Sequence, residues 1–419
     1  MISKKDLFLS YVAQTSPLSL ALEIDHAEGI HIYDTSGKRY YDMNSGISVS
    51  SLGHCHPRVT QAIKDQVDRY MHTMVYGEHN QSPQTSYAQL LIDQLDDHFE
   101  SLYYLMSGTE ATELAMKIGK RYTGRAEIIC ARNAYHGSTQ GAESLRSDQD
   151  YKEPFLPLLP GIKHIDFNSV DDINLITERT SCVIIEAVQG EAGVIPPNSG
   201  YLNLIRKRCT DVGALFILDE IQTGFGRTGL LFAHQKYGIV PDIMLIGKAM
   251  GGGMPIAGVV SSKEIMSCLI KKPVLGHITT FGGHPVSCAA SLATLEVLLH
   301  DKLIESVSEK ESFIKKKLDH NLIKEIRSSG LMMAVEITKL KYLKHIVACA
   351  VDHGVLVDWF LFNNRSFRLA PPLIATIDDL DKATDILLAA MDYAEGKYCL
   401  LYTSPSPRDR TRSRMPSSA

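Results

Sequence analysis

Residues 214–229 read ALFILDEIQTGFGRTG, and residues 243–255 read IMLIGKAMGGGMP. In each stretch a short apolar run, typical of a buried parallel strand, stops at a charged residue, Asp219 in the first and Lys248 in the second. Ligands of open α/β sheets bind beyond the carboxyl ends of such strands, so a carboxylate and a primary amine are expected at one edge of a sheet. This pairing suits pyridoxal phosphate, which proteins hold through a lysine imine with an aspartate facing the pyridinium nitrogen.

Length, composition and charge narrow the class of protein. The chain has 419 residues, more than one typical domain, with 44% hydrophobic and 22% charged residues, so we expect one large and one smaller domain. A formal net charge of −5 argues against nucleic acid or an anionic membrane surface as the main partner. The sequence has no apolar run of membrane-spanning length, no signal-peptide core and no paired metal-ligand spacing among its eight cysteines. We therefore expect a cytoplasmic protein.

The order of the predicted elements indicates an α/β fold. From about residue 55 to 300, apolar runs alternate with helical patterns, which predicts βαβ units and a mostly parallel sheet. The predicted strands span 102–106, 127–131, 182–188, 214–219, 242–247 and 256–260, and a long apolar helix spans 285–299. Outside this region the pattern predicts a hairpin at 30–42, a basic helix at 308–318, a strand at 331–337 and a last helix at 380–394.

These boundaries suggest a division of the chain. We predict an N-terminal segment (1–50) that packs with the small domain, a large cofactor-binding domain (51–300), a small C-terminal domain (301–396) and a tail (397–419). The tail turns abruptly to Ser, Pro and Arg. It is either a disordered native tail or, as we favour, translated cloning sequence, and it is left out of the functional argument.

Lys248 and Asp219 each have an ordinary explanation. A lone lysine at a strand end is most often solvated, and an aspartate there is often a helix N-cap. However, the three glycines after Lys248 allow a ligand to approach the backbone closely, and an ionised Asp219 in an apolar setting needs a cationic partner. A pyridinium nitrogen is such a partner, and Gln222, three residues on, is suited to bond a ring hydroxyl.

Ser107, Gly108, Thr109 and Glu110 open a helix whose apolar face begins at Ala111. Ser107 and Glu110 fit a capping box, and plain capping is the simpler explanation of this motif. A glycine between two hydroxyl side chains at a helix N-terminus also makes a phosphate cradle. Both roles can hold together.

Five further residues are candidates for the same site. Tyr135 could stack on a flat cofactor ring, although ordinary packing is the usual role of a pair such as Tyr135 and His136. Glu186 and Glu191 lie at the rim of the next predicted strand, where solvated loop charges are the alternative. Arg368, before a proline pair, suits bidentate carboxylate binding, with a surface ion pair as the alternative. The histidines around Cys55 and Gly283 show no metal-ligand spacing, so no metal site is expected.

Together these stretches resemble the class III (ω-amino acid, acetylornithine-type) pyridoxal-phosphate-dependent aminotransferases of fold type I. The motifs that carry the resemblance run in order from about residue 18 to 394: GHCHP at 53–57, SGTEA at 107–111, the Asp219 and Lys248 stretches, TTFGGHP at 279–285 and RLAPPL at 368–373. The resemblance implies a mostly parallel central sheet with helices on both faces, a smaller α+β domain, and a homodimer with shared active sites.

The resemblance also implies roles for single residues. Lys248 forms the internal aldimine and moves the proton, Asp219 pairs with the ring nitrogen, Gln222 bonds the ring oxygen, and Tyr135 stacks on the ring. His136 and Glu186 are placed beside the same ring. Ser107, Gly108 and Thr109 bind the phosphate, joined by Thr280 of a second subunit. Arg368 binds a substrate carboxylate and alternates with Glu191, so that one site accepts both an ω-amine donor and a dicarboxylic 2-oxo acid.

Two departures bear on the substrate. Acetylornithine- and ornithine-type members usually have an arginine where this chain has Ser138, and ornithine-type members tend to have a tyrosine near Ile47. The missing tyrosine weighs against free ornithine, while the motifs as a whole are most similar to the acetylornithine-type branch. From this resemblance we predict transfer from an acetylornithine-like or other ω-amino donor to 2-oxoglutarate. The alternatives are a 4-aminobutyrate- or diamine-type transaminase, an aminomutase or decarboxylase on the same scaffold, or a non-catalytic regulator that binds the cofactor.

Overall fold

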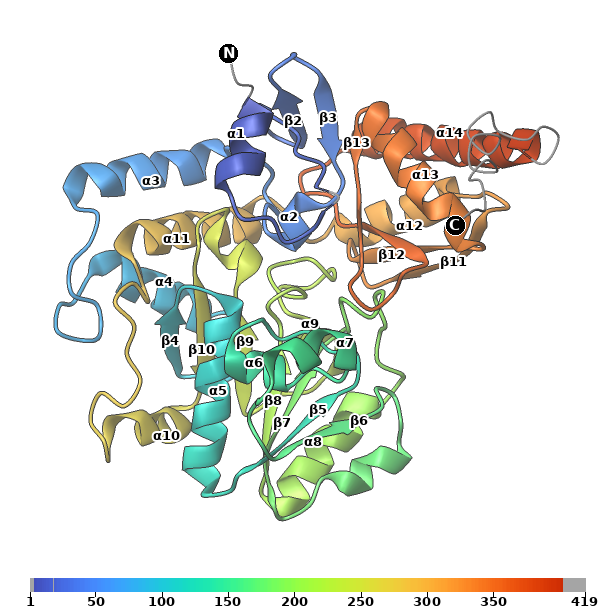
Figure 1. Ribbon diagram of the computed structural model, residues 1–419. Helices are drawn as coiled ribbons and strands as arrows, with labels where there is room; N and C mark the ends of the chain where they lie inside the picture. The colour runs from blue at the N-terminus through green and yellow to red at the C-terminus, as the bar shows by residue number, and fades with distance from the viewer. Residues whose placement is uncertain (1–3, 18, 402–419) are drawn as a thin grey trace, which may run out of the picture.

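The computed structural model describes residues 4–17 and 19–401, and the predicted tail from residue 402 onward lies outside the described residues. A seven-stranded sheet forms the lower part of the molecule in Figure 1, and two four-stranded sheets lie above it. Among the described residues no helix has both the length and the apolar character that a membrane crossing needs.

The large sheet carries the strands that the sequence predicts. Its strands are β4 (Ser101–Leu105), β5 (Glu127–Ala131), β6 (Ile162–Ile165), β7 (Thr180–Glu186), β8 (Leu215–Asp219), β9 (Ile243–Ile246) and β10 (Ala257–Ser261). They lie in the order β4-β10-β9-β8-β7-β5-β6, and only β10 runs antiparallel to its neighbours. The prediction of an α/β fold with a mostly parallel sheet is therefore confirmed.

Two details of the sheet differ from the prediction. The strand β6 was not predicted, because only its first and last residues, Ile162 and Ile165, are apolar. The strand β10 does not belong to a βαβ unit. Only the short helix η3 (Lys248–Gly251) and six further residues join it to β9, too few for the crossover that a parallel strand requires.

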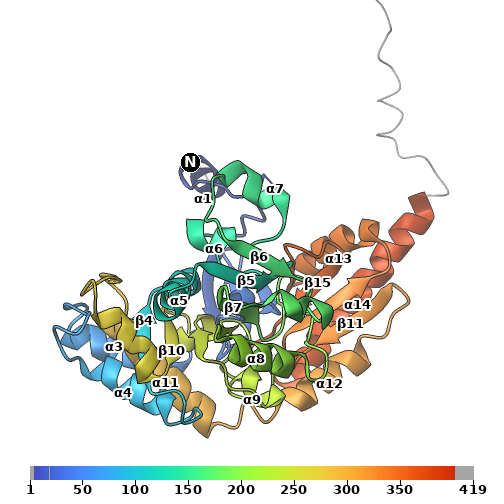
Figure 2. The same ribbon diagram turned by 90° about the horizontal axis from the view of Figure 1, so that it is seen from below.

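Helices cover both faces of this sheet, because alternate strand residues point to opposite sides. Ile184 and Ile217 pack towards α5 (Gly108–Thr123), whereas Val183 and Phe216 pack towards α8 (Tyr201–Val212). Figure 2 shows these two helices on either side of β7. The other helices up to residue 300 are α1 (Lys4–Tyr11), α2 (Ser45–Ser48), α3 (Pro57–Arg69), α4 (Ser82–Ile92), α6 (Gln140–Ser144), α7 (Gln149–Lys152), η1 (Glu153–Phe155), η2 (Asp171–Leu175), α9 (Ala233–Tyr237), α10 (Lys263–Met266), η4 (Ser267–Ile270) and α11 (Pro285–His300).

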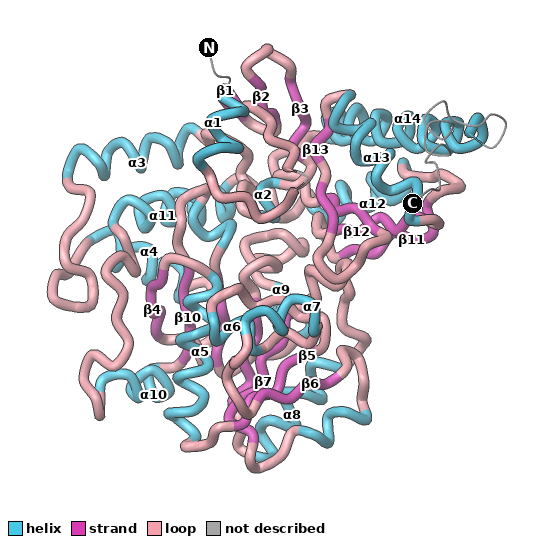
Figure 3. Tube along the Cα trace, viewed as in Figure 1, coloured by secondary structure: helices cyan, strands magenta, loops and turns pink. Residues whose placement is uncertain are grey.

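The two smaller sheets join the ends of the chain. One holds β1 (Ile24–Glu28), β2 (His31–Asp34), β3 (Arg39–Asp42) and β13 (Val355–Leu356). The predicted hairpin is thus confirmed as β2 and β3, and main-chain pairing of β3 with β13 ties it to the C-terminal part. The other holds β11 (Ile323–Ser328), β12 (Met333–Ile337), β15 (Ser366–Leu369) and β14 (Asp358–Trp359). Figure 3 shows it beside α12 (Val307–Lys317), α13 (Leu340–Asp352) and α14 (Ile377–Leu401).

One buried guanidinium connects these parts. Arg227 follows β8, is fully buried, and donates from Nη1 to the carbonyl oxygens of Leu331, at 2.9 Å, and Pro371, at 2.6 Å. Its Nη2 donates to Ser51 Oγ at 3.0 Å. Burial lowers the pKa of Arg227 to about 10. Arg227 therefore joins the segment before α3, the large sheet and the sheet that carries Arg368.

Candidate active site

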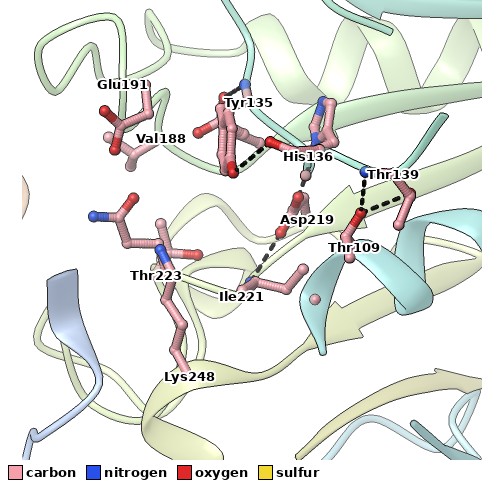
Figure 4. A pocket seen from close by; sticks show the side chains of 15 residues that line it. Thr109, Tyr135, His136, Thr139, Val188, Glu191, Asp219, Ile221, Thr223 and Lys248 are labelled. Atoms are coloured by element: carbon pink, nitrogen blue, oxygen red, sulfur yellow. Dashed lines mark hydrogen bonds and ion pairs between the residues drawn. The ribbon is translucent and has the colours of Figure 1, made fainter. Parts of the chain in front are cut away.

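A cavity of about 450 Å³ opens at the carboxyl ends of β7, β8 and β9, beside the N-terminus of α5. Its lining includes ten residues that the sequence singles out: Gly108, Thr109, Tyr135, His136, Ser138, Glu186, Glu191, Asp219, Gln222 and Lys248. Figure 4 shows the side chains of Tyr135, Asp219 and Lys248, among others, converging on this cavity from separate elements. The prediction that Asp219 and Lys248 lie together at one edge of the sheet is confirmed, because both line this cavity.

Asp219 is buried and bonded on both carboxylate oxygens. Its Oδ2 lies 2.7 Å from His136 Nδ1, and its Oδ1 accepts a hydrogen bond from the backbone N–H of Ile221 at 2.9 Å. Burial opposes a charge on His136, but the hydrogen bond to Asp219 and the negative charges of Asp219 and Glu186 together outweigh burial and raise the pKa of His136. The N-cap alternative for Asp219 is wrong, because turns, not a helix, follow β8.

Glu186 is a second buried carboxyl group at this end. It accepts hydrogen bonds from the backbone N–H groups of Tyr135, at 3.1 Å, and Gly190, at 2.7 Å. Burial raises the pKa of Glu186 to about 7, and the nearby charge of Asp219 acts in the same direction. Because both Glu186 and Glu191 are buried, the alternative that they are solvated loop charges is wrong.

Lys248 reaches into the cavity from the end of β9 (Figure 4). Its backbone has a φ of +48°, an uncommon conformation for a residue with a side chain and one that often occurs at functional sites. Burial, together with the positive charge of Arg368, lowers the pKa of Lys248 to about 8. The amine is therefore much closer to deprotonation at neutral pH than an exposed lysine.

The N-terminus of α5 faces the cavity through Gly108 and Thr109. The predicted capping box is confirmed: Ser107 Oγ accepts from the Glu110 N–H, and Glu110 Oε2 accepts from the Ser107 N–H at 3.1 Å. Ser107 itself lies just outside the cavity lining. Gly137 has a φ of +125°, and an added Cβ there would collide with Thr109, so only glycine fits this close approach.

Sequence reasoning missed several lining residues. Thr139 Oγ1 lies 2.8 Å from Thr109 Oγ1 and donates to Glu113 Oε1 at 2.5 Å, which orients the hydroxyl at the start of α5. Thr139 could have been found from the sequence, because it is a hydroxyl residue directly after the candidates Tyr135, His136 and Ser138. The other missed lining residues are Val188, Ile221 and Thr223.

Arg368 lies behind Glu191 at the other end of the cavity. Its Nη2 donates to Glu191 Oε1 at 2.5 Å, and its guanidinium carbon lies 4.6 Å from the ring centre of Phe360. Both charged side chains are buried, so the surface ion pair expected as the alternative for Arg368 is wrong. Nε and Nη1 of Arg368 have no hydrogen-bond partner within the described part of the chain. The guanidinium thus has unused donor capacity.

Thr280 and Ile47 do not line the cavity. Thr280 is exposed in the 279–283 loop. Ile47 is half-buried in α2, where four consecutive residues have positive φ angles between 53° and 65°. His54, near the discounted metal motif, bonds to Asp42 with 2.9 Å between Nε2 and Oδ2.

Comparison with known proteins adds family information to this geometry. The family described as aminotransferase class-III matches residues 11–391. The acetylornithine aminotransferase of Methanothermobacter thermautotrophicus is 35% identical over 92% of this chain and 96% of its own length. A [LysW]-aminoadipate semialdehyde/glutamate semialdehyde transaminase of Sulfurisphaera tokodaii is also 35% identical, over 90% and 96%. The ornithine aminotransferase structure from Toxoplasma gondii superimposes with a TM-score of 0.87 at 30% identity, covering 95% of this chain and 96% of that one.

Proposed function

The chain belongs to the class-III aminotransferases, and from this premise we propose that it transfers an amino group from an acetylornithine-like or other ω-amino donor to 2-oxoglutarate. One observation carries the proposal: a single cavity has Lys248 and Asp219 at one end and Glu191, bonded to the buried Arg368, at the other. Acetylornithine aminotransferases at about 35% identity favour this donor class over the 4-aminobutyrate or diamine alternative.

The cavity fits pyridoxal 5′-phosphate. The buried Asp219 suits a pyridinium nitrogen, and the N-terminus of α5, with Ser107, Gly108 and Thr109, suits a phosphate. Tyr135 and Gln222 both line the cavity, and we assign to Tyr135 the stacking on the ring and to Gln222 the bond to its hydroxyl. When bound, this cofactor supplies an electron sink for the negative charge that develops on the substrate carbon.

Lys248 is the residue to which we assign proton transfer. A general acid–base group works best when its pKa lies near the working pH, and the pKa of Lys248 is lowered to about 8. Nζ of Lys248 then takes the proton from the substrate carbon that bears the amino group and returns a proton later in the cycle. The hydrogen bond between His136 Nδ1 and Asp219 Oδ2 holds the carboxyl group of Asp219 in position.

The ion pair at the far end accounts for the use of two substrates. With Glu191 on Arg368 the positive charge is neutralised, which suits the uncharged part of an ω-amino donor. When a 2-oxo acid enters, Glu191 releases Arg368, which then binds the carboxylate of the acid through two parallel hydrogen bonds. The donors of Arg368 that lack partners support this exchange.

The assembly is part of the proposal. We infer a homodimer in which Thr280 of one subunit completes the phosphate site of the other. Large apolar side chains stand exposed around Thr280: Ile270, Val274, Leu275, Ile278 and Phe281. So many exposed apolar side chains within twelve residues support a role of this segment as a contact surface. We also propose that the large domain (51–300) binds the cofactor, that the small domain (301–396) supplies Arg368, that the enzyme is cytoplasmic, and that the tail is not native.

The test is a panel of amino donors with purified, cofactor-loaded protein and 2-oxoglutarate, followed by glutamate formation. We expect N-acetylornithine or a related ω-amino acid to give the highest kcat/KM. An aminomutase or decarboxylase would turn over its substrate without any oxo acid, which separates that alternative. A preparation that stays colourless and forms no glutamate with added pyridoxal phosphate would contradict the proposal.

A further inference from the structure

The loop between β14 and β15 places three consecutive residues against the substrate end of the cavity. Phe360 lies under the guanidinium of Arg368, at 4.6 Å from its central carbon. The backbone N–H of Leu361 donates to Glu191 Oε2 at 3.1 Å, and that of Phe362 donates to the Glu191 carbonyl oxygen, also at 3.1 Å. The loop therefore contacts both members of the ion pair.

A buried arginine anchors the tip of this loop. Arg146 is 4% exposed, and its guanidinium carbon lies 4.1 Å from the ring centre of Tyr151 and 5.1 Å from that of Phe362. The two rings meet edge to face, with centres 6.1 Å apart. Glu143 and Asp148, each 3.3 Å from a nitrogen of Arg146, hold the guanidinium in this position. We call Arg146, Tyr151 and Phe362 the aromatic clamp.

Asn363, the next residue of the loop, packs closely on the segment that carries Glu191. Gly193 has a φ of +98°, and an added Cβ there would come within 2.5 Å of Asn363 Nδ2. The same Nδ2 donates to the carbonyl oxygen of Ala192 at 3.4 Å. Loop 360–363 and the Glu191 segment therefore move together or must break several contacts to separate.

These contacts influence how easily Arg368 becomes available. One carboxylate oxygen of Glu191 bonds to Arg368 and the other to the Leu361 N–H, so Glu191 has two charge-assisted bonds to lose when it moves away. Only one of them belongs to the ion pair itself. The position of the loop thus contributes to the free-energy difference between the paired and the released states of Arg368.

We propose that loop 360–363, held by the aromatic clamp, is a specificity determinant: it stabilises Glu191 on Arg368 and so limits the affinity of the site for substrate carboxylates. Phe362 and Arg146 act as positioning residues that do not touch the substrate. This inference rests on the proposed exchange between Glu191 and the substrate carboxylate.

The test uses the Phe362→Ala variant of the cofactor-loaded enzyme. Removing the ring frees the loop tip, so glutarate, an unreactive dicarboxylate, should bind about threefold to tenfold more tightly by calorimetry, given the usual strength of such ring contacts. The KM for 2-oxoglutarate should fall by a similar factor. The affinity for pyridoxal phosphate, read from visible absorbance, should not change. Tyr151→Phe keeps the ring and should behave as wild type, and Phe362→Leu serves if the alanine variant folds poorly.

The possible results separate the two levels of the proposal. Unchanged or weaker glutarate binding in Phe362→Ala, or a parallel loss of pyridoxal phosphate affinity, would overturn the role of the loop. If the wild-type enzyme makes glutamate from an amino donor and 2-oxoglutarate, the proposed function stands whatever the loop variant does. If it does not, the proposed function fails independently.

Discussion

The two ends of the cavity are built differently. At the cofactor end, each oxygen of Asp219 has a partner, namely His136 Nδ1 and the Ile221 N–H. At the substrate end, Arg368 has one partner, Glu191, and two nitrogen atoms without any within the described residues. A group that acts on every substrate gains from a constant setting, whereas a group that must recognise two substrates in turn needs spare donors. The difference indicates where the enzyme is preorganised and where it is adaptable.

The largest effect should come from removing the amine of the preorganised end. We expect Lys248→Ala to lower kcat by about four orders of magnitude or more, because the described residues that line the cavity include no second lysine to take over the proposed proton transfer. The variant should also lose the visible absorption that the wild type acquires with pyridoxal phosphate. Lys263→Ala, at an exposed lysine, is the matched control and should leave both unchanged.

Asp219→Asn, at the same end of the cavity, should lower kcat by a smaller factor. The substitution keeps the shape of the side chain but removes the carboxylate that contacts His136 and that we propose as the partner of the ring nitrogen. Loss of one partner from a buried ion pair costs about 3 to 5 kcal/mol, so kcat should fall by roughly two to four orders of magnitude. Asp211→Asn, at an exposed aspartate paired with Lys207, should have no effect on kcat. A variant within threefold of wild type would show that Asp219 is not the partner of the ring.

Ser138→Arg should improve the binding of 2-oxoglutarate at the substrate end. Ser138 lines the cavity, is exposed, and lies beside Tyr135, with 3.1 Å between the two hydroxyl oxygens. A guanidinium there offers the second carboxylate of 2-oxoglutarate a charge-assisted bond, so the KM for this acceptor should fall about tenfold. Ser138→Gln, of similar length without charge, is the control. An unchanged KM would mean that this position does not limit acceptor binding.

The smallest effect concerns stability and pH. The folded pKa of Glu186 is about 7, above its ordinary value of 4.5, so between these values the folded state holds more protons than the unfolded state. The associated stability is fully present below pH 4.5 and is lost as the pH rises through 7. We expect Glu186→Gln to remove this pH-dependent contribution to the free energy of unfolding, on the order of 1 to 3 kcal/mol. The Tm difference between cofactor-free wild type and variant, measured from pH 4.5 to 7.5, should therefore shift in favour of the variant as the pH rises. A constant difference would contradict a raised pKa.

Much of the fold could be predicted, because local pattern and burial agree. Strands β5 and β8 are continuous apolar runs between breakers, and both form near the predicted residues. An apolar run looks the same in parallel and antiparallel strands, so the run that forms β10 does not itself give a direction. The predicted strands 242–247 and 256–260 nevertheless leave too few residues between them for a parallel crossover, and the sequence analysis missed this signal.

The site residues that directly follow a predicted strand could be identified from the sequence. Lys248 and Asp219 stand directly after apolar runs, so their neighbourhood could be inferred from the sequence. The bond between Asp219 and His136 joins residues 83 positions apart and depends on the sheet order. The contacts of loop 360–363 depend on how the C-terminal sheet lies against the large one, which no local pattern specifies.

The bonds of Arg227 have a consequence for how the chain can be divided. Its three partners lie near residues 51, 331 and 371, so a fragment that ends before residue 331 would carry a buried guanidinium with most of its acceptors missing. Such a loss costs about 3 kcal/mol or more, a large share of the stability of an ordinary protein. The two halves are therefore unsuited to separate expression, and heating should melt the subunit in one cooperative transition rather than in two steps.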